Sequence, residues 1–320
     1  MLPIRTIITI AVLTATTAHG KPLHSSDIYP ADYPTVQAVA YMGKLISERT
    51  DGRLSIKPLG PNDPETENYT VAEVSNGTLD MARVNLAVLA NIAPSSVLPS
   101  LPYLFKSTAH VRRVLDGPIG DEILASMESQ GIIGLCFYDM GSRSYGAKKP
   151  IRNVADMKGL KVRVQQSGIW VTMLRAMGAD PINIPDGRAY HALKSGVVDA
   201  AESTLPAYVQ WRHYEVAGVY SSTEHSMVPG VVIFSKKVWD GLSKEDQTII
   251  RAAARESVPY MRKLWDEYEV SARKTVEEAG AQVITDVDNK SFSDVLTPFY
   301  AQATTNPNLQ DTMKRIQLAD

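Results

Sequence analysis

An arginine between two valines is the clearest chemical feature of the sequence. Arg163 lies between Val162 and Val164 in the segment LKVRVQQ, and strand alternation puts it on the face opposite the valines. The segment continues into QQSGIW and a helix, so Arg163 lies near the carboxyl end of a strand and beside a helix N-terminus, where anions bind. A guanidinium also offers two parallel donors to a carboxylate. The pattern indicates an anion site, although alternation alone also allows Arg163 to face solvent.

Motifs of bond-making chemistry are absent from the sequence. It has no HExxH, CxxC, GxSxG, GxxxxGKS/T or GxGxxG motif, and none of its six histidines pairs with another four residues away. The sequence therefore predicts a protein that is not an enzyme, with no metal site and no cofactor.

Two segments contain weaker candidates. DGRAYHALKSG carries Asp186, Arg188 and His191, which resemble an acid–base cluster. Asp186 is better explained as the cap of a helix that begins near Gly187. Trp170 fits a core position, and it is also a candidate for stacking on a sugar ring if it lies in a cleft.

Length and composition limit the class of protein. A chain of 320 residues with 44% hydrophobic content can bury a core large enough for two domains. Its 33 basic and 35 acidic residues nearly cancel and form no long run of one sign, so nucleic acid is not expected as a partner. The single cysteine, Cys136, lies in the apolar run GIIGLCFY and is expected to be a buried thiol.

The N-terminal segment MLPIRTIITIAVLTATTAHGKP has the features of a signal peptide. One positive charge, Arg5, precedes an apolar run, and small residues follow at Ala18 and Gly20. The run of about 12 residues is shorter than the roughly 20 that span a bilayer. We expect cleavage near Gly20, which removes residues 1–20 and leaves the mature protein in the periplasm.

Strand-like and helix-like segments alternate along the rest of the chain. This alternation predicts an α/β protein with substantially parallel sheets. The strand-like segments are RLSIKPLG, TLDMARVN, GIIGLCFYD, LKVRV, DPINIP, VVDAAES and GVVIFS.

Two segments resemble each other, VSNGTLDMARVN and LKSGVVDAAEST. In each, a helix is expected to end at a glycine, Gly77 or Gly196, where a left-handed backbone is favourable. A strand then ends in a polar residue, which is where open α/β sheets bind ligands. Alignment of the glycines pairs Asp80 with Asp199, Ala82 with Ala201, and Asn85 with Thr204.

The segment 243–280 predicts one very long helix. It opens with SKED, in which Ser243 is the expected cap, and it ends at Gly280. Its length of roughly 55 Å exceeds one small lobe. The helix could brace two lobes or form a dimer seam; Pro259 and an irregular heptad pattern favour the brace.

Several of these motifs together resemble one family. LPYLF, GSRSYGAKKPI followed by DMKGLKVRV, YHALKSGVVDAAES, FSKKVWDGLSKEDQ and the long helix are similar to the extracytoplasmic solute-binding proteins of tripartite ATP-independent periplasmic (TRAP) transporters. The resemblance implies a two-lobed periplasmic-binding-protein fold with hinge strands and one long helix across both lobes. It divides the chain into one lobe of residues 21–144 with about 230–262, and a second of 145–229 with about 263–320.

The resemblance also implies a function. Members capture an organic acid and deliver it to TRAP permease subunits, and PADYPTVQAVAYMG, FYDMGSRS and STEHSMVP look most like a sugar-acid subgroup that takes uronates. We expect such a ligand and a monomeric protein. A sensor that presents an organic acid to a membrane receptor is the alternative.

Site residues follow from the family motif position by position. Arg163 matches the arginine that holds the ligand carboxylate, and Arg143 matches a second arginine. Ser203 stands where most relatives have asparagine, and Asp186 stands where an aromatic residue is usual. The remaining candidate ligand contacts are Asn85, Arg83, Gln165, Trp170 and Thr204.

Overall fold

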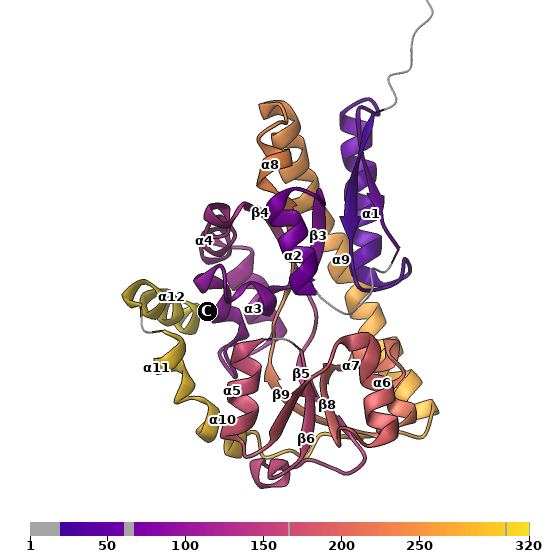
Figure 1. The fold of residues 1–320 in the computed structure, drawn as a ribbon, viewed down its shortest axis with the longest axis vertical. Helices are drawn as coiled ribbons and strands as arrows, with labels where there is room; N and C mark the ends of the chain where they lie inside the picture. The colour runs from indigo at the N-terminus through magenta and orange to yellow at the C-terminus, as the bar shows by residue number, and fades with distance from the viewer. Residues whose placement is uncertain (1–19, 61–66, 166, 305, 320) are drawn as a thin grey trace, which may run out of the picture.

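A computed structural model of the chain describes residues 20–60, 67–165, 167–304 and 306–319. The predicted signal peptide, apart from Gly20, lies outside these residues. The described chain forms two mixed sheets with helices packed around them (Figure 1). The expected α/β class and two-lobed architecture are confirmed.

The first sheet has the strand order β2-β1-β3-β10-β4. Strand β1 is parallel to β2 and β3, whereas β10 is antiparallel to β3 and β4. The strands are β1 (Lys21–Ser26), β2 (Leu54–Pro58), β3 (Met81–Asn85), β4 (Ile132–Tyr138) and β10 (Gly230–Ser235).

The second sheet has the order β11-β9-β5-β8-β6-β7. Strand β6 is parallel to β7 and β8, and β5 is antiparallel to β8 and β9. The strands are β5 (Arg143–Ala147), β6 (Lys161–Val164), β7 (Asp180–Asn183), β8 (Ala200–Thr204), β9 (Val219–Ser226) and β11 (Gln282–Ile284).

All seven predicted strands are present, but the expectation of substantially parallel sheets is only partly right. The described chain crosses between the sheets three times, directly from β4 to β5 and from β9 to β10, and then through α9 from β10 to β11. After each direct crossing the chain runs in the direction opposite to the strands on either side of it. Strands β5 and β10 are therefore antiparallel to their neighbours. The connecting segments 139–142 and 227–229 join the two lobes.

Helices cover both sheets. The two glycines of the repeated segments do have left-handed backbones, with φ of 84° at Gly77 and 77° at Gly196. The helices are α1 (Pro34–Arg49), α2 (Glu67–Asn76), α3 (Thr108–Leu115), α4 (Pro118–Ala125), α5 (Gly168–Ala176), α6 (Asp186–Ser195), α7 (Leu205–Gln210), α8 (Lys236–Trp239), α9 (Lys244–Glu278), α10 (Asn289–Leu296), α11 (Phe299–Ala303) and α12 (Pro307–Leu318), with short 3-10 turns η1 (Leu86–Leu89), η2 (Pro94–Ser100), η3 (Glu128–Gln130), η4 (Val154–Met157) and η5 (His213–Glu215).

The predicted long helix is α9, which has 35 residues. The Ser243 hydroxyl caps it by accepting a hydrogen bond from the Asp246 N–H at 3.0 Å, and the helix continues through Pro259. It packs against α1 and β4 in the first lobe and against α7 and β11 in the second, as a brace does (Figure 1).

The C-terminal helices lie on both lobes. Helix α10 contacts α5 and β9, whereas α12 contacts α4 and η2. Arg315 of α12 forms a bidentate ion pair with Glu122, with both contacts at 2.8 Å. We propose that residues 307–318 move with the first lobe, and we retain the rest of the predicted division.

Substitution of Trp265 in α9 measures how much the packing of this long helix contributes to stability. Its side chain is buried and packs edge-on to Tyr33, close to Gly141 in the segment between the lobes. Trp265→Ala should lower the free energy of unfolding by about 3–5 kcal/mol because it leaves a large cavity. Urea unfolding measures this. The exposed control on the same helix, Val270→Ala, should change it by no more than about 0.5 kcal/mol.

Candidate ligand-binding site

Arg163 is fully buried, so the solvent-facing alternative does not apply. Strand β6 places it in register with Ile182 of β7 and Ala201 of β8. Its Nε donates to the Ile184 carbonyl oxygen at 2.7 Å, which fixes the guanidinium plane. Neither terminal nitrogen of the guanidinium makes a hydrogen bond. Buried donors without partners are costly, and this is where a ligand would supply acceptors.

Asp186 does not cap α6, contrary to the expectation from its local sequence. The cap position is Pro185, and the Asp186 carboxylate instead turns toward β6. Its Oδ2 lies 3.0 Å from Arg163 Nη2 and accepts a hydrogen bond from Gln165 Nε2, also at 3.0 Å. The ion pair of Asp186 with the buried guanidinium stabilises the folded state more than a helix cap would, because water can take the place of the cap. This explains why Asp186 pairs with Arg163 and does not cap α6.

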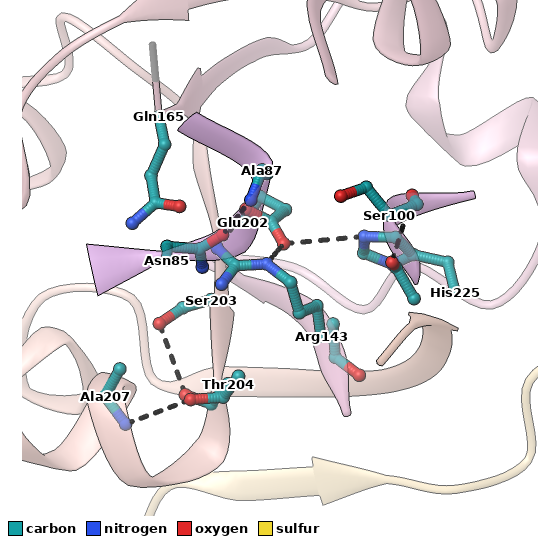
Figure 2. A network of polar contacts seen from close by, with 12 residues as sticks. Asn85, Ala87, Ser100, Arg143, Gln165, Glu202, Ser203, Thr204, Ala207 and His225 are labelled. Atoms are coloured by element: carbon teal, nitrogen blue, oxygen red, sulfur yellow. Dashed lines mark hydrogen bonds and ion pairs between the residues drawn. The ribbon is translucent and has the colours of Figure 1, made fainter. Parts of the chain in front are cut away.

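Arg143 forms the centre of a second buried network. Its Nε and Nη2 donate to the two carboxylate oxygens of Glu202, and the guanidinium lies 4.2 Å from the centre of the Trp170 ring. His225 Nε2 approaches Glu202 Oε1 at 3.6 Å. Figure 2 shows Asn85, Gln165 and Ser203 arranged around the guanidinium. Because Trp170 is buried with Arg143 over its ring, it supports Arg143 and does not present that face to a sugar.

The repeated segments end in the same way. Asn85 Oδ1 accepts a hydrogen bond from the Ala87 N–H at 2.9 Å and caps η1, and Thr204 Oγ1 accepts one from the Ala207 N–H at 3.4 Å and caps α7. The Ser203 hydroxyl donates to the Thr204 carbonyl oxygen at 3.2 Å (Figure 2). Asn85 and Thr204 therefore have structural roles in addition to their place at the ends of the strands.

The aspartates of the repeated segments also match. The Asp80 carboxylate accepts from the His24 N–H at 2.8 Å, and the Asp199 carboxylate accepts from the Lys161 N–H at 2.9 Å. In both cases the donor lies on the neighbouring parallel strand. The short sequence repeat thus corresponds to a repeated contact in the two lobes.

The first lobe contributes a charged cluster around Arg83. Arg83 is buried; its Nε and Nη2 donate to the Asp27 carboxylate, and Nη1 lies 3.5 Å from Glu67 Oε1. Glu67 also accepts a hydrogen bond from the Asn85 N–H at 3.0 Å. Tyr29 lies under the guanidinium, 5.1 Å from it. Arg83 is thus held by internal carboxylates.

The pKa values of residues in the Arg83 cluster are affected by a charged group of the second lobe. Burial raises the pKa of Glu67 to about 7, and the charge of Asp186 adds to this effect although Arg83 opposes it. Burial and then Asp186 also raise the pKa of the Tyr29 hydroxyl. Asp186 belongs to the second lobe, so the acidic groups of the two lobes face each other across the cleft.

Two carboxylates of the second lobe stay ionised. Burial alone would raise the pKa of Asp186, but the charge of Arg163 outweighs it and holds the pKa below its ordinary value. Glu202 follows the same rule, with Arg143 and His225 outweighing the effect of burial on its pKa.

Sequence reasoning missed several residues of this region. Asp27, Glu67 and His213 belong to no motif. His213 is fully buried with neither ring nitrogen hydrogen-bonded, and burial and then Arg163 lower its pKa to about 3. Trp211 Nε1 is also buried without a partner, beside Tyr29. A lone histidine gives no signal until the fold buries it near Arg163, and a lone tryptophan gives none until it is buried beside Tyr29.

Comparison with known proteins identifies the family. Residues 25–306 match the family model described as bacterial extracellular solute-binding protein, family 7. A solute-binding protein of Chromohalobacter salexigens is 32% identical over 96% of this chain and 92% of its own length. The 2,3-diketo-L-gulonate-binding periplasmic protein of Escherichia coli K12 is 34% identical over 79% of this chain and 77% of its own.

Solved structures show the same fold. A TRAP periplasmic solute-binding protein of Bradyrhizobium sp. BTAi1, in complex with α/β-D-galacturonate, has a TM-score of 0.90 and 49% identity, covering 93% of this chain and 99% of its own. A TRAP periplasmic solute-binding protein from Xanthobacter autotrophicus Py2 with bound β-D-galacturonate has a TM-score of 0.91 and 46% identity, covering 93% and 100%.

The fold and the family match thus define an extracellular solute-binding protein. More specifically, the chain belongs to the bacterial extracellular solute-binding protein family 7, whose members serve TRAP transporters, as its motifs predicted. No helix in the described parts of the chain is both long and apolar enough to cross a membrane.

Glu67 makes the stability of the protein depend on pH. Its pKa of about 7 in the folded state exceeds the ordinary 4.5. The protonated form therefore stabilises the folded state below pH 4.5, and this contribution is lost as the pH rises through 7. The loss between pH 5 and pH 8.5 should be on the order of 3 kcal/mol.

The measurement is urea unfolding of the wild type and Glu67→Gln across this range. The buried histidines have lowered pKa values and act in the opposite sense below pH 6.5, so the difference between the two proteins isolates Glu67. Glu122→Gln is the control, because the ion pair with Arg315 lowers the pKa of Glu122 and places its titration below this range. Parallel curves for wild type and Glu67→Gln would contradict the assignment.

Proposed function

We propose that this chain captures a hexuronate, with D-galacturonate as the first candidate, in the periplasm and delivers it to the membrane subunits of a TRAP transporter. The observation that carries the proposal is Arg163, which is fully buried between the lobes with both terminal guanidinium nitrogens free of hydrogen bonds. The two similar structures described above, at 49% and 46% identity, hold galacturonate.

The free polar atoms near Arg163 fit a hydroxylated acid. Some of these protein atoms are hydrogen-bond donors and others are acceptors. A ligand hydroxyl can pair with either kind, whereas a ligand carboxylate can only accept. An apolar ligand would leave each of them unsatisfied at about 1–3 kcal/mol. Among the buried atoms of described residues without hydrogen bonds, those related to Arg163 are its own Nη1 and Nη2, Gln165 Oε1, and His213 Nδ1 and Nε2.

In this proposal the ligand carboxylate lies against Arg163, on the side that faces Arg143. Glu202 already holds two nitrogens of Arg143, so Arg143 acts chiefly through its charge. Asn85, Gln165 and Ser203 surround the space beside it and are assigned to ligand hydroxyls (Figure 2). The Ser203 hydroxyl donates to the Thr204 carbonyl oxygen, so it can accept a hydrogen bond from the ligand, whereas an asparagine would offer a donor and an acceptor together.

Closure of the lobes follows from a ligand that contacts both of them. Asn85 comes from β3 of the first sheet, whereas Arg163 and Ser203 come from β6 and β8 of the second. A ligand that touches both sets binds the closed state better and shifts the population toward it. The closed protein, acting as a monomer, then presents the ligand to the permease.

Arg163→Ala tests the carboxylate contact. Loss of a charge-assisted contact of 2–4 kcal/mol should weaken galacturonate binding by about 30- to 1,000-fold. Isothermal titration calorimetry with galacturonate, glucuronate and succinate measures both the affinity and the preference for hexuronates. Thermal unfolding without ligand verifies that the variant folds.

Arg212→Ala is the matched control, because Arg212 lies in the same lobe with a side chain that is 69% exposed. It should bind galacturonate as the wild type does. Wild-type affinity in Arg163→Ala would disprove the contact, and tighter binding of succinate than of either hexuronate would disprove the ligand class.

A further inference from the structure

Asp186 presents an unused acceptor beside the unused donors of Arg163. Its Oδ2 holds Gln165 Nε2 and approaches Arg163 Nη2, whereas its Oδ1 accepts no hydrogen bond from a described residue. The Asp186 side chain is 11% exposed, and Arg163 is closed to solvent. The 3.0 Å contact between Arg163 Nη2 and Asp186 Oδ2 lacks the alignment of a hydrogen bond, so the donors of Arg163 remain available.

A donor and an acceptor side by side recognise a hydroxyl group. A hydroxyl can accept from an Arg163 N–H and donate its own proton to Asp186 Oδ1. A carboxylate at that position has only acceptors, and it would face the ionised Asp186 carboxylate in a site that excludes water. Like charges at such distances are strongly unfavourable when buried.

The ion pairs that described residues form around Asp186 leave no spare positive charge. Arg83 is already matched by Asp27 and Glu67, and Arg163 by Asp186, which makes three carboxylates for two guanidinium groups. Arg143 lies at the other end with Glu202 as its own partner. A first ligand carboxylate can still accept from the free donors of Arg163, whereas a second one beside Asp186 would meet its negative charge with no unpaired guanidinium to offset it.

We infer that Asp186 is a specificity-determining residue, whose carboxylate accepts a ligand hydroxyl and excludes a second ligand carboxylate. The site then takes sugar acids with one carboxylate and rejects aldaric acids, which carry one at each end of the same chain of hydroxyls. This inference rests on the proposed function and names the residue that restricts the site to acids with one carboxylate.

The test compares galacturonate with galactarate, which has the same hydroxyl configuration and a carboxylate in place of the aldehyde carbon. Calorimetric titration of the wild type should show a preference for galacturonate of at least about 100-fold. In Asp186→Asn, which keeps the size of the side chain and removes its charge, this preference should fall by at least about tenfold because galactarate binds better.

Asp180→Asn is the control for net charge. Asp180 lies at the exposed start of β7 in the same lobe, so its removal should leave the preference unchanged. A wild type that binds galactarate within about threefold of galacturonate would overturn the inference while leaving the proposed function intact. An unchanged preference for galacturonate over galactarate in a folded Asp186→Asn variant would also overturn the inference.

The two hypotheses fail in different ways. Absence of binding of any sugar acid to the wild type would remove the proposed function and the inference with it. If Asp186→Asn does not fold, a wild type without a preference for galacturonate over galactarate would still overturn the inference.

Discussion

The cleft depends on one constraint, that a buried guanidinium needs a carboxylate from the protein itself. Arg83 has Asp27, Arg143 has Glu202, and Arg163 has Asp186. An unmatched charge in such a place would cost several kcal/mol. Each pair also fixes a backbone relation: β3 to the segment after β1, β5 to β8, and β6 to the start of α6. The ion pairs therefore set the geometry of the site before any ligand is present.

The three pairs differ in what they leave for a ligand. Asp27 and Glu202 each engage two nitrogens of their arginines, whereas Asp186 approaches only one nitrogen of Arg163. The carbonyl oxygen of Ile184 orients Arg163 from the other side without neutralising it. Arg163 is thus held in place with donors to spare, a form of preorganisation that reduces the entropy lost on binding.

Local patterns in the sequence predicted much of the fold and part of the site. Strand alternation predicted the orientation of Arg163. The SKED capping motif predicted that α9 begins at Ser243, and the glycine pattern predicted the ends of α2 and α6. The antiparallel β5 and β10 were not predicted, because alternation is the same in either direction and the crossing between sheets is a tertiary feature.

The site residues that were missed share a cause. Asp186 fitted a helix cap, and only the approach of β6, more than 20 residues earlier, revealed its pairing with Arg163. Glu67 and His213 belong to no motif, and their shifted pKa values arise from burial against groups distant in sequence. Chemistry that depends on tertiary burial cannot be read from residue spacing.

The connections between the lobes determine how the cleft can open. Two short segments, 139–142 and 227–229, join the sheets, and two points of attachment define a line. Rotation about that line is the one rigid-body movement that stretches neither segment. Helix α9 is a third connection between the lobes, and its Trp265 lies beside Gly141 in the first of these segments, so the lobes cannot turn about the segments without moving against α9. Turning of the lobes is therefore coupled to this helix as well as to the two strand connections.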